Sequence, residues 1–126
     1  MIMRRFDHVD LRVTDLEEAR PFYEALLPAL GFDRPANIAG WVQFESSSEN
    51  GTAEFFGLTE SPGHVANESR IAFWATSVDE VDRLARIATD AGARNCEGPS
   101  HESPTYYAFF FEDSSGNRFE ICHRKV

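Results

Sequence analysis

The chain has 126 residues, of which 42% are hydrophobic and 13% aromatic, so we expect one globular domain with a substantial core. Its net charge of −9 disfavours nucleic acid and anionic membranes as partners, and no apolar run approaches the roughly 20 residues of a membrane span. The first residues lack the apolar segment of a signal peptide, so we expect a cytoplasmic protein with reduced thiols at Cys96 and Cys122.

Residues 6–32 predict a strand followed by a helix. Polar and apolar residues alternate from His8 to Val13, which is typical of a strand with one apolar face. Thr14 and Glu17 then have the spacing of a capping box, in which side chains bond free backbone N–H groups at the start of a helix. Apolar residues follow at helical spacing, so the helix is predicted to bury one face.

The same pattern returns in residues 69–94 and makes an internal repeat. Alternation begins again at Arg70, and Ser77 with Glu80 forms a second capping box ahead of a second amphipathic helix. His8 aligns with Arg70 at an offset of 62 residues (70 − 8). A repeat of this length is one supersecondary unit, so we expect two such units in the fold.

Each strand–helix unit is followed by segments that predict further strands. The strands are short, alternate in polarity and flank polar turns, which is typical of antiparallel hairpins. In the first half we expect strands near 32–36, at 40–44 and at 52–58, with a turn at 45–51; in the second half we expect a weaker strand at 94–97, a loop at 98–104, and strands at 106–112 and 117–123 around the DSSG turn.

These elements predict an α+β fold of two tandem βαβββ modules within a single domain, 1–126. Module one is 1–58, module two is 69–126, and the Pro-, Gly- and Ser-rich segment 59–68 is the linker. Side by side, the modules are expected to form a cupped mixed sheet with the helices on its convex face. Alternation then predicts two sets of positions: Val9, Leu11, Val13, Ile71, Phe73, Phe119 and Ile121 toward the helices, and His8, Asp10, Arg70, Ala72, Glu120 and Cys122 toward the cup.

The DSSG turn fixes the register expected for the last hairpin. If Asp113 pairs with Asn117, residue numbers across the hairpin add up to 230, and Glu120 lies opposite Phe110. Tyr106 and Phe110 then line the cup, where aromatic side chains suit a hydrophobic or planar ligand. The alternative is that these aromatic residues only pack.

Three polar side chains interrupt apolar strands and are candidate metal ligands: His8, Glu54 and Glu120. Imidazole and carboxylate groups are good ligands for first-row divalent metals, and such sites need three or four of them. The alternative for each residue taken alone is a solvated side chain on the exposed face of a strand.

The chain resembles the vicinal oxygen chelate superfamily, which includes glyoxalases, bleomycin-resistance proteins and extradiol dioxygenases. The motifs that carry the resemblance are HVDLRVTDLEEARPFYEALLPALGF at the start, RIAFWATSVDEVDRL in the middle and YYAFFFEDSSGNRFEICH at the end. The resemblance implies paired βαβββ modules, usually assembled as a homodimer with small-molecule pockets in the cups. It also implies metal ligands at His8 and Glu120, and more loosely at Glu54.

Arg70 departs from the family pattern, because the resemblance implies a second histidine ligand at this position. Arginine stays protonated and cannot bind a metal. In one interpretation a divalent Zn, Ni, Mn or Fe ion still binds through His8, Glu54 and Glu120, with His101 or water completing the shell. In the other, the Arg70 guanidinium replaces the metal and pairs with Glu120 or Glu54, or binds an anionic ligand.

Two functions therefore remain open at the level of the sequence. The first is a glyoxalase-like lyase or isomerase that acts on a small molecule, through a metal or, without one, through Arg70 as anion holder and His101 as acid–base group. The second is a ligand-sequestering protein of the bleomycin-resistance type. Extradiol dioxygenase chemistry is disfavoured by the missing histidine. The candidate catalytic residues are Glu120, His101 and Arg70, and the candidate ligand-binding residues are Tyr106, Phe110, Trp74 and Asp10.

Overall fold

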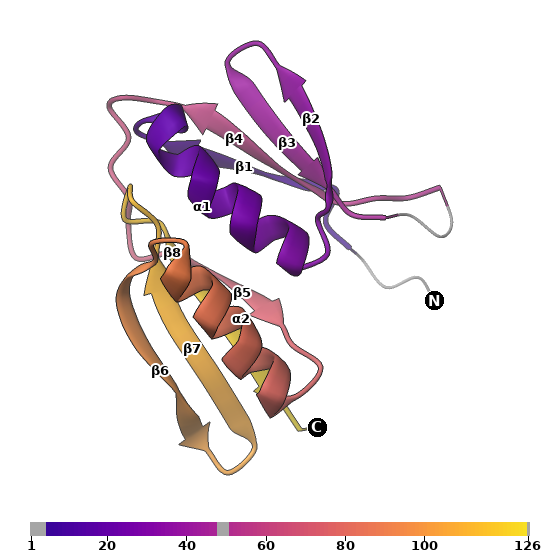
Figure 1. Cartoon of the computed structure of the whole chain (residues 1–126), viewed down its shortest axis with the longest axis vertical. Helices are drawn as coiled ribbons and strands as arrows, with labels where there is room; N and C mark the ends of the chain where they lie inside the picture. The colour runs from indigo at the N-terminus through magenta and orange to yellow at the C-terminus, as the bar shows by residue number, and fades with distance from the viewer. Residues whose placement is uncertain (1–4, 48–50, 126) are drawn as a thin grey trace.

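A computed structural model describes residues 5–47 and 51–125 and has the predicted α+β architecture (Figure 1). Two βαβββ modules follow one another in the chain. Its elements are β1 (His8–Val13), α1 (Leu16–Ala29), β2 (Arg34–Ile38), β3 (Trp41–Glu45), β4 (Phe55–Glu60), β5 (Arg70–Trp74), α2 (Val78–Asp90), β6 (Arg94–Ser103), β7 (Tyr106–Glu112) and β8 (Arg118–Arg124). Within the described residues, no helix is long and apolar enough to cross a membrane.

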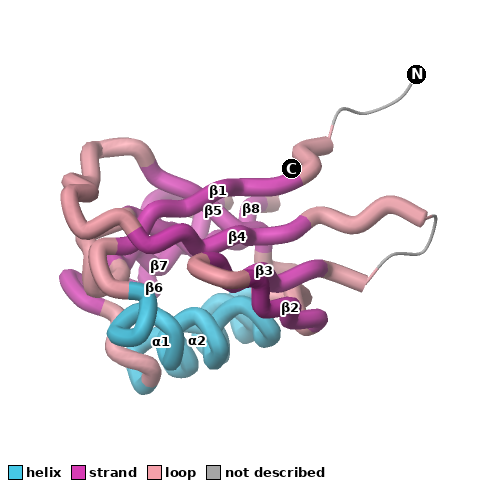
Figure 2. Tube along the Cα trace, turned by 90° about the horizontal axis from the view of Figure 1, so that it is seen from above, coloured by secondary structure: helices cyan, strands magenta, loops and turns pink. Residues whose placement is uncertain are grey.

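The strands form two four-stranded mixed sheets. Sheet A has the order β1-β4-β3-β2 and sheet B the order β5-β8-β7-β6; the first strand of each module runs parallel to its last, and the other pairs are antiparallel. Both helices lie on the same side of the strands (Figure 2). The described strands of sheet A do not pair with those of sheet B, so the expected single sheet is two sheets. The face of each sheet away from the helices is called its open face below.

The positions predicted to face the helices do pack against the core. Val13, Phe119 and Ile121 are fully buried, and the other positions predicted to face the helices pack against the same core. Phe22 of α1 contacts Phe111 of sheet B edge-on, with ring centroids 6.2 Å apart, so the first helix also covers the second module. Burying a side chain of this size contributes about 2 kcal/mol.

The start of α1 differs from the prediction. Its N-cap is Asp15, whose side chain accepts a hydrogen bond from the Glu18 backbone N–H at 3.1 Å, so the predicted box of Thr14 and Glu17 is wrong by one residue. Thr14 instead bonds Ser115 of the β7–β8 turn, through its backbone N–H, at 2.9 Å. Aspartate and threonine both cap helices, and only the tertiary contact decides between two adjacent candidates.

The last hairpin has the predicted register. The Asp113 backbone N–H bonds the Asn117 carbonyl at 3.0 Å, and Phe110 is the direct partner of Glu120. Tyr106 pairs with Arg124 at the other end of the hairpin. Alternation therefore places Tyr106, Phe110 and Glu120 together on the open face of sheet B.

A buried carboxylate in the β7–β8 turn ties this hairpin to module one. Asp113 is 1% exposed, and it accepts hydrogen bonds from the Tyr23 hydroxyl of α1 and from the backbone and side-chain N–H groups of Asn117. Burial and the adjacent carboxylate raise the pKa of Tyr23 well above its ordinary value. Asn117 also donates to the Arg12 carbonyl of β1 at 2.8 Å. This hydrogen-bond network, Tyr23–Asp113–Asn117–Arg12, joins the two modules.

Two predicted segments are placed differently. The expected loop 98–104 is wrong, because β6 continues through Ser103; as the edge strand of sheet B it accommodates Pro99 and irregular pairing that a central strand would not. β4 begins at Phe55, so Glu54 precedes the strand instead of lying within it. The predicted turn 45–51 lies partly outside the described residues.

Candidate functional site

The open face of sheet B brings several predicted site residues together. Direct pairing places Arg70 beside Arg118 and Ala72 beside Glu120 in β5 and β8, while Phe110 of β7 lies on the other side of Glu120. All of these side chains share one face because they stand at alternate positions of their strands.

Glu120 is the buried carboxylate of this face. It is 6% exposed, and it accepts a hydrogen bond from the Tyr106 hydroxyl. Tyr106 lies in β7 four residues before Phe110, the direct partner of Glu120, so its side chain reaches Glu120 diagonally across the hairpin. Burial, together with this bond, raises the pKa of Tyr106 to about 12. Tyr106 is therefore a hydrogen-bond donor at physiological pH, and it satisfies a carboxylate that would otherwise be costly to bury.

Cys122 follows Glu120 on the same face, and it is the buried thiol that the sequence predicts. It is 6% exposed, and burial and the neighbouring Glu120 raise its pKa. A thiol of this kind is protonated and unreactive at neutral pH. The guanidinium of Arg124 lies over the Tyr106 ring, 3.7 Å from its centroid, and closes this end of the face.

Arg70 lies over an aromatic ring and not in a carboxylate pair. Its Cζ is 4.8 Å from the centroid of Phe110, a cation–π contact. Among residues 5–47 and 51–125, Arg70 forms no ion pair within 4.0 Å, so the expected pair with Glu120 or Glu54 is not present in the described chain. The positive charge remains available on the open face.

The polar residues on the open face of sheet A have local partners. His8 bonds Asp7 at 2.8 Å, and its ring stacks on Phe55 with centroids 4.7 Å apart. Asp10 accepts hydrogen bonds from Thr59 at 3.1 Å and from Arg12 at 2.9 Å. These exposed pairs satisfy the charges without forming a common site.

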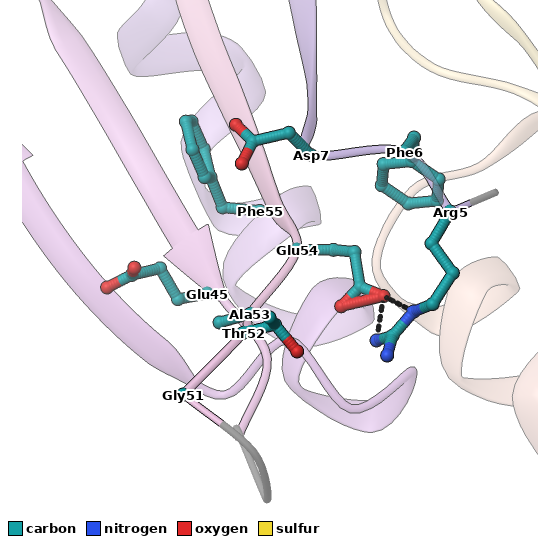
Figure 3. Close-up of a pocket in the computed structure, with 9 residues that line it drawn as sticks. All are labelled: Arg5, Phe6, Asp7, Glu45, Gly51, Thr52, Ala53, Glu54 and Phe55. Carbon is teal, nitrogen blue, oxygen red and sulfur yellow. Dashed lines mark hydrogen bonds and ion pairs between the residues drawn. The ribbon is translucent and has the colours of Figure 1, made fainter. Parts of the chain in front are cut away.

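Glu54 lies just before β4, a central strand of sheet A, and lines a cavity of about 630 Å³ (Figure 3). Its carboxylate points toward Arg5, which donates to it from Nε at 2.7 Å and from a second guanidinium nitrogen. The Arg5 hydrogen bond lowers the pKa of Glu54. Neither Glu120 nor Arg70 lines this cavity, so it is separate from the site on sheet B.

The three candidate metal ligands do not converge within one chain. Among the described residues, no three His, Cys, Asp or Glu side chains are arranged to hold a metal ion. His8 is the first residue of β1. Asn117 donates a hydrogen bond to the Arg12 carbonyl, near the other end of β1, and it directly precedes Arg118, the first residue of β8. Four residue steps of a strand separate His8 from Arg12 by roughly 13 Å. The residues of a single chain therefore do not fit a metal at His8, Glu54 and Glu120.

Two further candidates lie apart from Glu120. His101 is in β6, pairs with Tyr107 and contacts its ring edge-on at 4.8 Å, while the Tyr107 hydroxyl donates to Asp82 of α2 at 2.6 Å. His101 is therefore on the helix side of sheet B, the side opposite Glu120. Trp74 does share the open face and is 68% exposed.

Arg118 was not among the predicted site residues. It is the direct partner of Arg70 and also of Glu112, so it lies at the centre of the rung that precedes Glu120. The alternation that places Glu120 and Cys122 on the open face also places Arg118 there, two residues earlier. This pattern would have identified it from the sequence.

Comparison with known proteins agrees with this architecture. The profile of the Glyoxalase/Bleomycin resistance protein/Dioxygenase superfamily matches residues 5–121, which is most of the chain. The chain belongs to this superfamily. No curated protein matches it at a significant level.

Solved structures of the superfamily share the fold over nearly the whole chain. A glyoxalase/bleomycin resistance protein from Albidiferax ferrireducens T118 has 29% sequence identity and a TM-score of 0.76, and the alignment covers 95% of this chain and 98% of that one. The genomically encoded fosfomycin resistance protein FosX from Listeria monocytogenes has 16% identity and a TM-score of 0.76, with 99% and 97% covered. A glyoxalase/bleomycin resistance protein/dioxygenase from Nocardioides has 17% identity and a TM-score of 0.69, with 98% and 86% covered. The last two likenesses show the fold alone.

Proposed function

We propose that this superfamily member binds a small molecule on the open face of sheet B, with Arg70 supplying a fixed positive charge in place of a metal ion. The observation that carries the proposal is the position of the Arg70 guanidinium, over Phe110 and without an ion-pair partner among the described residues. Electrostatic repulsion disfavours the binding of a cation within about 4 Å of a guanidinium, by about 4 kcal/mol per unit of charge at an intermediate dielectric constant. The same guanidinium attracts an anionic group.

The metal content of the protein tests this proposal. Wild type and Arg70→His are incubated in parallel with zinc, nickel and manganese, desalted and analysed by mass spectrometry. We expect wild type to retain far less than one metal ion per site and Arg70→His to retain more. Arg83→His, on the exposed surface of α2, is the matched control for adding a histidine. Wild type with one tightly held metal ion per site would overturn the proposal.

A second candidate is a metal-dependent lyase or isomerase of the glyoxalase type. It is supported by the placement of His8 and Glu120, each on an open face that a second copy of the chain can cover. In a homodimer, sheet A of one copy facing sheet B of the other would combine His8 and Glu54 with Glu120, and a Zn, Ni, Mn or Fe ion held there would polarise substrate oxygens. His8→Ala would then lose metal without losing the dimer in sedimentation. The cytoplasmic location and the module boundaries stay predictions.

A further inference from the structure

A small pocket opens on sheet B at the rung that precedes Glu120. Its volume is about 210 Å³, which suits a molecule the size of an amino acid. Charges of both signs line it together with two aromatic residues, the half-buried Phe110 and the buried Phe111. We call this the charged pocket; the residues that matter for it are Arg70, Arg118, Glu97, Glu112, Asn95 and Phe110.

Strand pairing explains why these charges gather. Arg70, Arg118 and Glu112 are neighbours on one rung of β5, β8 and β7, and Phe110 and Glu97 are partners on the next rung of β7 and β6. Side chains on adjacent strands of one face lie about 5 Å apart at their origins. Two guanidinium groups therefore stand on the β5–β8 side and two carboxylates on the β7–β6 side, around Phe110.

These four charged side chains are not in close ion pairs with one another. Within the described ranges, none of Arg70, Arg118, Glu97 and Glu112 forms an ion pair within 4.0 Å. Elsewhere in the molecule arginine does pair: Arg5 with Glu54 and Arg12 with Asp10. Opposite charges that share a pocket without touching leave room for a ligand group between them.

The edge of the pocket is shaped by an irregularity in β6. The pairing register shifts between Arg94 and Glu97, and Asn95 between them has a φ of 51°, in the left-handed region. The Asn95 side chain donates to Glu112 Oε1 at 3.0 Å and so holds one carboxylate at the pocket wall. Bulges of this kind re-aim side chains and are common beside binding sites.

We infer that the charged pocket binds a small zwitterion, a molecule that carries one carboxylate or phosphonate group and one ammonium group. The acidic group lies between Arg70 and Arg118, whose guanidinium forks match its geometry. The ammonium group lies toward Glu112 and Glu97, and the short apolar chain between them rests on Phe110. This inference rests on the proposed function and names the class of ligand for the same face.

A set of probes that each contain four carbon atoms tests the requirement for both charges. The probes are γ-aminobutyrate, butyrate and n-butylamine, each titrated into uniformly 15N-labelled protein and followed by amide chemical shifts. We expect γ-aminobutyrate to shift the amides of β5, β7 and β8 and to bind about tenfold more tightly than either singly charged probe. Butyrate binding as tightly as γ-aminobutyrate would overturn the inference, and so would the absence of saturable shifts with all three.

Variants connect that binding to the pocket. Arg118→Gln and Glu112→Gln are each expected to weaken γ-aminobutyrate binding about tenfold, and Arg118→Lys less, because lysine keeps the charge but loses the fork. Arg83→Gln, on α2, is the matched control and should bind as wild type does. Unchanged binding by Arg118→Gln would overturn the assignment. If the zwitterion inference alone is wrong, the metal contents of wild type and Arg70→His are still as expected. If the proposed function is wrong, those metal contents differ from the expected ones.

Discussion

The two modules repeat one backbone but differ at the centre of their open faces. With the 62-residue offset, Asp10 of β1 corresponds to Ala72 of β5. Asp10 pairs with Gly57 of β4, and Ala72 pairs with Glu120 of β8. The same pairing makes Trp41 of β3 the counterpart of Ala108 of β7. In module one the Trp41 ring covers Gly57 so closely that a Cβ atom there would lie 2.9 Å from Trp41 Cζ2.

This difference shows how the two halves of a duplicated fold can fill the same central space with different side chains. In module one a tryptophan fills the centre of the open face, and the charges around it are exposed and paired with neighbours. In module two small Ala72 and Ala108 leave that space to Glu120 and Tyr106. All three buried polar residues within the described ranges belong to the β7–β8 hairpin: Asp113, Asn117 and Glu120.

The largest effect is expected from removing the buried carboxylate of that hairpin. Asp113→Ala leaves the Tyr23 hydroxyl and the Asn117 N–H groups without their acceptor, so we expect the free energy of unfolding to fall by about 4 kcal/mol. Urea unfolding followed by circular dichroism measures it. Asp10→Ala, an exposed carboxylate of module one, should cost under about 1 kcal/mol. Equal losses in the two variants would break the contrast between the modules.

The packed centre of module one is tested by adding one methyl group. Gly57→Ala forces its Cβ against the Trp41 ring, so we expect a loss of about 2 kcal/mol in thermal or urea unfolding. Gly63→Ala, where the new Cβ meets no heavy atom within 4 Å, is the control and should change stability by less than about 0.5 kcal/mol. A neutral Gly57→Ala would mean that Trp41 does not hold this position.

Tyr106 provides a test of the buried carboxylate at the centre of module two. Tyr106→Phe leaves Glu120 without this donor, and we expect a loss of about 1 kcal/mol at neutral pH. Because folding raises the Tyr106 pKa to about 12, this contribution is complete below the unfolded pKa of 10 and is lost as the pH rises toward 12. The stability difference between wild type and Tyr106→Phe should therefore shrink over that range. A difference that grows with pH would contradict the hydrogen bond.

The smallest effect is expected from the ion pair between Arg5 and Glu54 in module one. The Arg5 hydrogen bond lowers the Glu54 pKa, so its contribution is present above the unfolded pKa of 4.5 and is lost on acidification through the folded pKa. Arg5→Ala should reduce stability at neutral pH by less than about 1 kcal/mol, since the arginine is exposed. Unfolding midpoints of wild type and Arg5→Ala should converge at low pH, and a constant difference would contradict the ion pair.

The sequence predicted local pairing better than the meeting of distant segments. The turn around Asp113 and the alternation of β8 placed Glu120 opposite Phe110, because a short turn and a two-residue period determine which neighbours share a face. They did not reveal that His8, Glu54 and Glu120 would not form a metal-binding cluster among the described residues of one chain, since alternation assigns a face but not the relative position of two sheets. The same limit applies to His101, which depends on how an irregular edge strand pairs.

The hydrogen-bond network Tyr23–Asp113–Asn117–Arg12 has a consequence for the independence of the two halves. Its donors and acceptors come from both modules, so a fragment containing only one module would lose these hydrogen bonds and expose to water the apolar surface that packs between the modules. We therefore expect that neither half folds alone, despite its complete set of strands and its own helix. The duplication is visible in the backbone, but we expect the two modules to unfold in one cooperative transition.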